Sequence, residues 1–318
     1  MRLRDVGEFG LIERIERALR RAGAADGESV VLGIGDDAAV LRARADEDVV
    51  VSTDALVEDV HFRWQEEPAG AIGRRALAAA LSDLAAMGAR PLGVVIALAA
   101  PPALPLARLD GLVRGLAGAA HRWQAPLVGG NVTRGAGCSL VLTALGAVRR
   151  GRALRRDAAR PGDRLLVTGT LGGAALAVAR AARSGRRRGP APEPRLVAGR
   201  ALARLAGIGA CIDISDGLLA DLSHLLQASH VGATLEPARV PHPRGFVGAC
   251  AALGADPERL ALTGGEDYEL LFSIRAAGPS AAVLGRRLGV RVTEIGRIEA
   301  RRGLRGVPAF GTAGWEHF

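Results

Sequence analysis

Carboxylates gather in five short stretches of this sequence, each beside small or apolar residues. An unpaired carboxylate is costly to bury, and the neighbours here are mostly Gly, Ala, Ser and Thr rather than Arg. Any single acid could be a helix cap, but five such clusters together favour a hard metal ion, above all Mg²⁺. The stretches are GDDAAV (35–40), STDALVEDVHF (52–62), LSDLAAMGA (81–89), DISDGLLADL (213–222) and TGGEDYEL (263–270).

Magnesium held by several carboxylates usually serves phosphate chemistry, where the cation neutralises charge on phosphate oxygens. Glycine turns such as LVGGNVTRG and LTGGEDYE agree with this hypothesis, because glycine lets the backbone approach a ligand closely. The chain contains no Lys, which excludes a Walker A loop. A nucleotide enzyme of this composition would use metal ions, backbone N–H groups and Arg. Arg134 and Arg156 are candidates, although either could be an ordinary solvated Arg.

The length of 318 residues suits two domains, which we place at 1–150 and 151–318. Apolar residues make up 49% but aromatics only 3%, so the core must be built from Ala, Val and Leu. Both halves alternate strand and helix patterns, which indicates an α/β architecture.

The hydrophobic periodicity predicts the following elements. Helices are expected at 7–22, 68–90, 105–122 and 195–206, and strands at 30–41, 48–62, 91–101, 125–135, 139–151 and 292–300. A strand, turn and helix are expected over 160–182 and again over 210–229, an exposed loop over 184–195, and a strand, turn and strand over 260–274.

Charge and cysteine content limit the classes of partner and location. The net charge of +9 could attract nucleic acid or phosphorylated small molecules, or could reflect Arg replacing Lys on exposed helices. Basic stretches without interleaved aromatics support nucleic-acid binding only weakly. Cys138, Cys211 and Cys250 are widely spaced without a CxxC motif, which predicts a reduced, cytoplasmic setting. The N-terminus has no signal-peptide pattern and no apolar run spans a membrane, so we expect no membrane association.

The acid-rich stretches occur in the order found in thiamine-monophosphate kinases, together with GEFGLI (7–12), VGGNVTRG (128–135) and the ending GWEHF. The chain resembles that family from residue 7 to 318. The resemblance implies the two-domain α/β (α+β) fold of aminoimidazole ribonucleotide synthetase, with N-terminal strands that pair across a homodimer and a C-terminal α/β domain. It implies transfer of the ATP γ-phosphate to thiamine monophosphate, giving thiamine diphosphate and ADP, with several Mg²⁺ ions and no general base.

The resemblance also implies roles for residues of this chain. Metal ligands would be Asp37, Ser52, Thr53, Asp54, Asp83, Asn131, Asp213 and Asp216; the ATP site would be Gly130, Asn131, Arg156 and Ser215; the contacts to thiamine monophosphate would be His61, Glu266 and Trp315. A carboxylate and an indole face suit the cationic thiazolium. Without the resemblance, His61 would pass for an ordinary His at a strand end.

Asn131 departs from the family, which usually has Asp at this position. An Asn side chain can coordinate a cation through its carbonyl oxygen, but it carries no charge. We therefore expect one Mg²⁺ to bind more weakly than in the family at large.

Two other classes of function remain open at this point. One is a different ATP-using enzyme of the same superfamily, acting on another phosphate or carbonyl; the GGEDYEL stretch and the GWEHF ending favour the thiamine branch. The other is an Arg-rich nucleic-acid binder with a steep salt dependence. The carboxylate clusters disfavour it, because they would repel phosphate unless they held metal.

Overall fold

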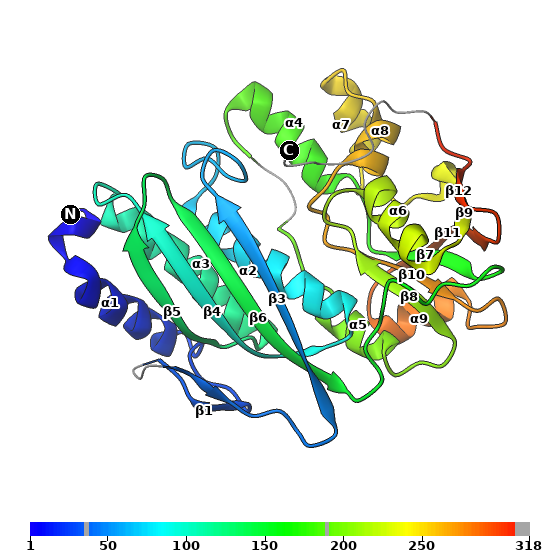
Figure 1. Ribbon diagram of the computed structural model, residues 1–318. Helices are drawn as coiled ribbons and strands as arrows, with labels where there is room; N and C mark the ends of the chain where they lie inside the picture. Colours follow the sequence, from blue (N-terminus) through cyan, green and yellow to red (C-terminus); the bar gives the residue numbers. More distant parts are fainter. Residues whose placement is uncertain (35–37, 188–190, 309–318) are drawn as a thin grey trace. The chain divides into compact units, whose positions relative to one another are not determined.

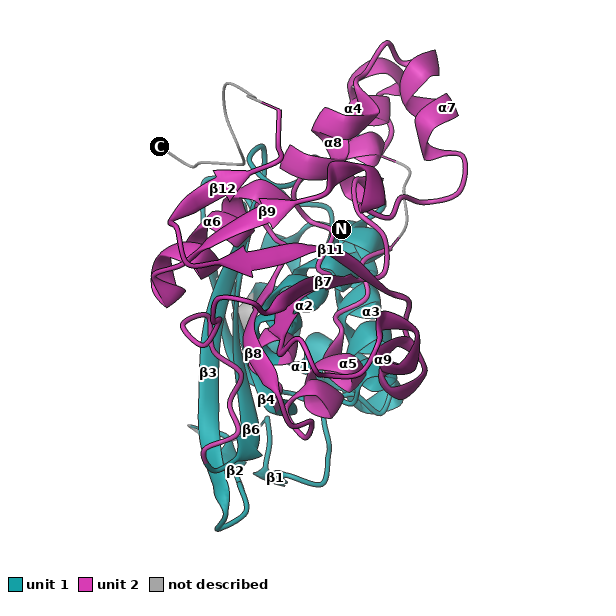
Figure 2. Ribbon diagram, turned by 90° about the vertical axis from the view of Figure 1, so that its right-hand side faces the viewer, with its two compact units in different colours: residues 1–84, 90–150 teal, residues 85–89, 151–318 magenta. Residues whose placement is uncertain are grey.

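The computed structural model describes residues 1–34, 38–187 and 191–308 (Figure 1). These residues form two compact units, shown in different colours in Figure 2. Unit 1 comprises 1–84 with 90–150, and unit 2 comprises 85–89 with 151–318. Both units combine sheet and helix, so the expected α/β class is confirmed.

Unit 1 is built on a four-stranded sheet in the order β3-β6-β4-β5. Its strands are β3 (Glu47–Val57), β4 (Arg90–Ala100), β5 (Leu127–Arg134) and β6 (Ser139–Arg149). Three helices lie on one face of this sheet (Figure 1): α1 (Gly7–Arg21), α2 (Ala69–Ala86) and α3 (Leu106–Trp123). Strands β4 and β5 are parallel and joined by α3, as a parallel pair requires a crossover; the other pairs are antiparallel.

The other face of the unit 1 sheet displays apolar side chains to solvent. Alternate residues of a strand point to opposite faces, and in β3 the odd-numbered ones point away from the helices. Val49 and Val51 are 55% and 61% exposed there, and Val141 of β6 is 37% exposed. Val49 and Val51 are two residues apart on β3, and Val141 lies opposite Ala55 further along the strand pair. Exposed apolar side chains on one sheet face favour an interaction surface.

The expected continuous strand over 30–41 is wrong. Two short antiparallel strands occupy its ends, β1 (Val30–Leu32) and β2 (Val40–Leu41). Glycine weakens a strand interior, and Gly33 follows β1 directly. Asp36 and the predicted ligand Asp37 lie outside the described residues.

Unit 2 contains a six-stranded sheet in the order β12-β9-β11-β7-β10-β8. Its strands are β7 (Arg164–Thr168), β8 (Ile208–Asp213), β9 (Gly232–Leu235), β10 (Leu270–Ile274), β11 (Val292–Glu299) and β12 (Gly303–Arg305). Its helices are α4 (Gly173–Ser184), α5 (Leu196–Leu202), α6 (Leu218–Ser229), α7 (Phe246–Ala252), α8 (Pro257–Thr263) and α9 (Ala281–Leu288). Two short 3-10 helices, Leu3–Asp5 in unit 1 and Pro237–Arg239 in unit 2, complete the set within the described ranges.

The core of unit 2 is aliphatic, as the low aromatic content requires. Strand β10 is buried along its whole length, and Leu165, Ile212 and Leu271 belong to one cluster around it, with Phe246 among the few aromatics. The helices of the described ranges include none that is long and apolar enough to cross a bilayer.

The strand expected before the GGEDYEL turn is also wrong, because LALT is the last turn of α8. Asp256 caps this helix by accepting a hydrogen bond from the N–H of Glu258 at 2.9 Å, and Pro257 occupies the first helical position. Both residues are typical helix-start signals, so the sequence contained the information that identifies α8.

Candidate functional site

A group of oxygen ligands lies in unit 1 where β3 faces α2. The even-numbered residues of β3 point toward the helices, which places Ser52 and Asp54 on this side. The Ser52 hydroxyl donates a hydrogen bond to the carboxylate of Asp83 in α2, and Asp54 accepts one from the N–H of Ala55 at 2.7 Å. Hydroxyl and carboxylate oxygens are the ligands that Mg²⁺ prefers, so this donor set fits that ion.

Thr53 and Asn131, two further predicted ligands, lie on the opposite face of the same sheet. Thr53 is hydrogen-bonded to Thr143 of β6, hydroxyl to hydroxyl, at 3.2 Å. Asn131 pairs in register with exposed Ala97 of β4. Strands β3 and β5 are the two edges of the sheet, so the two residues are separated by three strand spacings, roughly 14 Å. Within one chain they cannot bind one ion together.

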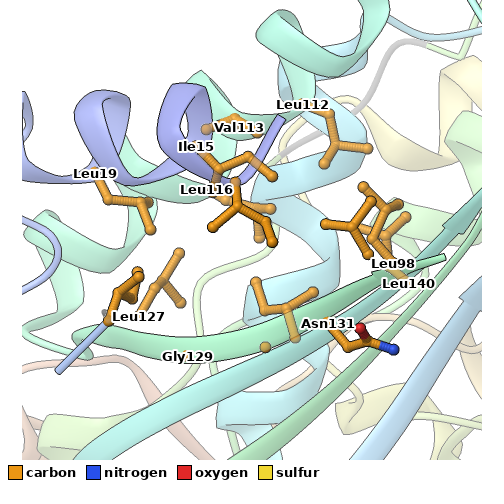
Figure 3. A pocket seen from close by; sticks show the side chains of 15 residues that line it. Ile15, Leu19, Leu98, Leu112, Val113, Leu116, Leu127, Gly129, Asn131 and Leu140 are labelled. Carbon is orange, nitrogen blue, oxygen red and sulfur yellow. The ribbon is translucent and has the colours of Figure 1, made fainter. Parts of the chain in front are cut away.

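An apolar cavity lies between this sheet and helices α1 and α3. Ile15, Leu116 and Leu127 line it (Figure 3). The Asn131 amide points away from this cavity (Figure 3). Its neighbour Gly130 packs so tightly that an added Cβ would lie 2.1 Å from the Ile96 carbonyl oxygen. The glycine of the predicted ATP-binding turn is therefore required by strand packing, whatever it binds.

His61, a predicted substrate contact, is fixed by a buried ion pair that sequence reasoning missed. One guanidinium nitrogen of Arg75, in α2, donates to the His61 carbonyl at 2.8 Å and to Glu67 at 2.7 Å. The His61 Nδ1 accepts from the N–H of Val57 at 3.1 Å, which assigns the proton of the neutral ring to Nε2. Nothing in the sequence distinguishes Arg75 from the many arginines on exposed helices.

In unit 2, the end of β8 brings the second acidic group together. Asp213 is the last residue of β8 and is 3% exposed. Asp221, in the first turn of α6, accepts hydrogen bonds from the N–H groups of Ser215 at 3.0 Å and of Asp216 and Gly217 at 3.1 Å each. Burial, together with the neighbouring carboxylates of Asp213 and Asp216, raises the pKa of Asp221 to about 7 against the opposing effect of the N–H groups. A site with this much negative charge fits a bound cation.

The backbone of the GGEDYEL turn lies directly against the β8 turn. The Glu266 N–H donates to the Ser215 carbonyl at 2.7 Å. A Cβ on Gly265 would lie 2.3 Å from that same oxygen. Glu266 and Tyr268 both have positive φ angles, 64° and 51°, a conformation that non-glycine residues keep only where the surroundings enforce it. The turn therefore places Glu266 beside Ser215 and Asp216.

Asp267, next in this turn, has a structural role. Its carboxylate accepts from the N–H of Gly172 at 2.7 Å and of Ala174 at 3.2 Å, at the start of α4. Burial raises its pKa to about 7, against the opposing effect of these N–H groups. Asp267 thus caps α4, the alternative role that the sequence left open for such acids, whereas Asp221 binds the N–H groups of the turn that precedes α6.

The remaining predicted residues are placed as follows. Arg156 is exposed and lies in a segment that runs beside β8, where the N–H of Cys211 donates to the Arg155 carbonyl at 2.9 Å. Trp315 lies outside the described residues. Among the described residues, no three Asp, Glu, His or Cys side chains gather closely enough to hold a metal alone. Waters and phosphate oxygens would complete the coordination, as is usual for Mg²⁺.

Family models match both halves of the chain. The model for AIR synthase related protein, N-terminal domain, matches residues 35–148, and the model for the C-terminal domain matches residues 160–307. The chain thus carries both domains of the AIR synthase related class.

Individual relatives narrow the class. A thiamine-monophosphate kinase of Escherichia coli K12 is 39% identical over 310 residues, 92% of this chain and 91% of the relative. The crystal structure of thiamine-monophosphate kinase from Stenotrophomonas maltophilia K279a is 38% identical, with a TM-score of 0.80 over 92% of this chain and 94% of that one. The structure "AaThiL complexed with AMPPCP and TMP" is 28% identical, with a TM-score of 0.77 over 100% and 99% of the two chains. The chain belongs to the thiamine-monophosphate kinase family.

Proposed function

We propose that this protein transfers the γ-phosphate of ATP to thiamine monophosphate, giving thiamine diphosphate and ADP. The observation that carries this proposal is the contact between the β8 turn and the GGEDYEL turn. It sets oxygen ligands suited to cation-bound phosphate, Asp213 and Asp216, beside Glu266, a carboxylate suited to the cationic thiazolium. Relatives of 37–39% identity named thiamine-monophosphate kinase support the same reaction.

The acceptor in this reaction is a phosphate that is already ionised at neutral pH, so the chain needs no general base. The barrier comes from repulsion between two anions, and alignment with charge neutralisation lowers it. Mg²⁺, when bound, supplies that neutralisation. We place protein ligands for Mg²⁺ in each unit by itself. In unit 1 they are Ser52, Asp54 and Asp83, with Asp37 and Thr53 as further ligands; in unit 2 they are Asp213 and Asp216.

The remaining roles follow the same proposal. Gly130, Asn131, Arg156 and Ser215 contact ATP, and His61, Glu266 and Trp315 contact thiamine monophosphate. The His61 Nδ1 accepts the N–H of Val57, so we assign the opposite, Nε2 edge of the ring to the substrate.

The experiment that tests the function is ADP release from ATP and Mg²⁺ with thiamine monophosphate, with free thiamine, and with neither. We expect ADP and thiamine diphosphate to form in equal amounts only with the monophosphate. ADP release that is independent of the monophosphate, or a product other than thiamine diphosphate, would instead indicate another reaction of the superfamily.

Asn131→Asp is expected to lower the Mg²⁺ concentration that gives half-maximal rate, by about threefold to tenfold. The substitution replaces an amide that is exposed on β5 with a charged carboxylate. A carboxylate binds Mg²⁺ more strongly than an amide oxygen does. The rate is measured as a function of Mg²⁺ at saturating ATP and thiamine monophosphate. An unchanged Mg²⁺ requirement would remove Asn131 from the metal site.

We infer that the protein is a homodimer whose partner covers the outer face of the unit 1 sheet. The exposed Val49, Val51 and Val141 support this inference, as does the separation of Thr53 and Asn131 on that face, since a second copy could bring one to the other. Light scattering at micromolar concentration should give twice the chain mass, and a monomer mass would refute the dimer.

A cytoplasmic location agrees with this reaction, which consumes ATP. All three cysteines are free thiols and buried. Burial raises the pKa of the Cys138 thiol to about 12, so this thiol stays protonated at neutral pH.

A further inference from the structure

The Arg-rich segment 184–195, expected from sequence to be an exposed loop, is tied to the GGEDYEL turn through its described ends. Arg195 binds Glu269 with two hydrogen bonds, from Nε at 2.6 Å and Nη2 at 2.5 Å. Arg187 forms an ion pair with Glu266. Both ion pairs join the Arg-rich segment to the GGEDYEL turn. The two carboxylates differ in their exposure and in their other contacts.

The Arg195–Glu269 pair is structural. Glu269 is 3% exposed and also accepts a hydrogen bond from the hydroxyl of Thr168, at 2.6 Å. Its carboxylate therefore faces the interior of unit 2. Arg195 holds the segment in place whether or not a ligand is bound.

The Arg187–Glu266 pair is different because Glu266 is the carboxylate we assign to the thiazolium. Its side chain is 26% exposed and that of Arg187 is 13% exposed. The positive φ of Glu266 and its backbone hydrogen bond to Ser215 hold the main chain of the turn in place. A cation that approaches this carboxylate therefore meets a guanidinium already bound there.

We propose that Arg187 is a specificity-determining residue, which pairs with Glu266 in the unliganded protein and with the phosphate of thiamine monophosphate in the complex. This inference rests on the proposed function. The thiazolium takes the Glu266 carboxylate, and the released guanidinium binds the phosphate, for which its planar fork is well suited. In the complex, the Glu266 carboxylate then lies beside the thiazolium, and the Arg187 guanidinium lies beside the phosphate.

Free thiamine brings the same cation without the phosphate. Its binding takes the Glu266 carboxylate away from Arg187 and brings a positive ring beside the guanidinium, and separating a partly buried ion pair is costly. Arg187 thus disfavours the unphosphorylated compound, which could not accept a phosphate to give the diphosphate in one step. Arg187 therefore favours thiamine monophosphate in two ways: it attracts the phosphate of the substrate, and it repels the ring of free thiamine.

The test compares dissociation constants for thiamine and thiamine monophosphate, measured by calorimetry with Mg²⁺ and AMPPCP, so that no phosphate is transferred. In Arg187→Gln we expect thiamine to bind more tightly and thiamine monophosphate to bind no more tightly than before. The ratio of the two constants should fall by about tenfold, the effect of 1.4 kcal/mol. Arg186→Gln removes the same charge from the neighbouring exposed residue and should keep the wild-type ratio.

Arg187→Lys keeps the charge but loses the fork, so its ratio should lie between those of wild type and Arg187→Gln. A ratio in Arg187→Gln within twofold of wild type, or an equal fall in Arg186→Gln, would overturn the proposal. The kinase assay separates the two failures. If wild type forms thiamine diphosphate and the ratio does not move, only the role of Arg187 is lost; if wild type forms none, the proposed function is lost as well.

Discussion

Asp83→Asn is expected to lower kcat by about a thousandfold at saturating ATP, thiamine monophosphate and Mg²⁺, while the protein stays folded. Asp83 is the carboxylate on α2 to which Ser52 of β3 donates its hydroxyl hydrogen bond. The amide has nearly the same shape but loses the charge that balances a bound cation. Metal-bound charge neutralisation contributes several kcal/mol to phosphate chemistry, and each 1.4 kcal/mol is tenfold in rate.

Two matched variants separate this effect from a general disturbance of unit 1. Ser52→Ala removes the hydroxyl but keeps the carboxylate, so its loss should be smaller, about tenfold. Asp110→Asn makes the same acid-to-amide change on α3, where Asp110 pairs with Arg14 at 2.5 Å, and should leave kcat within twofold of wild type. If Asp83→Asn keeps more than a third of wild-type kcat with an unchanged thermal midpoint, Asp83 is not a metal ligand.

Much of the fold could be predicted because it depends on local patterns. Apolar spacing located α1, α2 and α3 to within a few residues, and the alternation of strands and helices gave the α/β class. The missed helix α8 shows where pattern reading fails, since its seven residues (Pro257–Thr263) are too few for a clear period. There the capping residues Asp256 and Pro257 were the better signal.

The candidate site was predictable as a set of residues but not as a geometry. Motifs place Ser52, Thr53 and Asp54 in one group, whereas strand alternation sends the middle residue to the other face of the sheet. The acidic residues of these motifs also fall into two groups, those that bind backbone N–H groups and those that remain as candidate metal ligands. Asp221 and Asp267 accept hydrogen bonds from backbone N–H groups, a role that the spacing of DISDGLLADL and TGGEDYEL allowed but could not distinguish from metal binding.

The ion pairs were beyond the sequence altogether. Arg187 and Glu266 are 79 residues apart, and Arg195 and Glu269 are 74 apart. With 42 basic residues, all of them Arg, composition offers no way to choose the partner of a given carboxylate. Only the folded chain shows that the Arg-rich segment and the acidic turn meet.

Glu67→Gln is expected to lower the free energy of unfolding by about 3–5 kcal/mol, because it breaks an ion pair that is almost fully buried. The side chains of Arg75 and Glu67 are 5% and 6% exposed and lie 2.7 Å apart, nitrogen to oxygen. The same Arg75 nitrogen holds the His61 carbonyl, so the KM for thiamine monophosphate should also rise. Urea unfolding followed by circular dichroism measures the first effect, and steady-state kinetics the second.

The neighbouring residue provides the control. Glu66 pairs with Arg63 at 3.1 Å with side chains 26% and 57% exposed, so Glu66→Gln should cost less than about 1 kcal/mol. A double variant, Glu67→Met with Arg75→Met, should regain much of the stability lost in Glu67→Gln, since apolar residues of similar volume often replace a buried ion pair without loss. It should not regain the KM, because the double variant removes the Arg75 nitrogen that donates to the His61 carbonyl. If the double variant recovered both the stability and the wild-type KM, Arg75 would stabilise the helix but would not position His61.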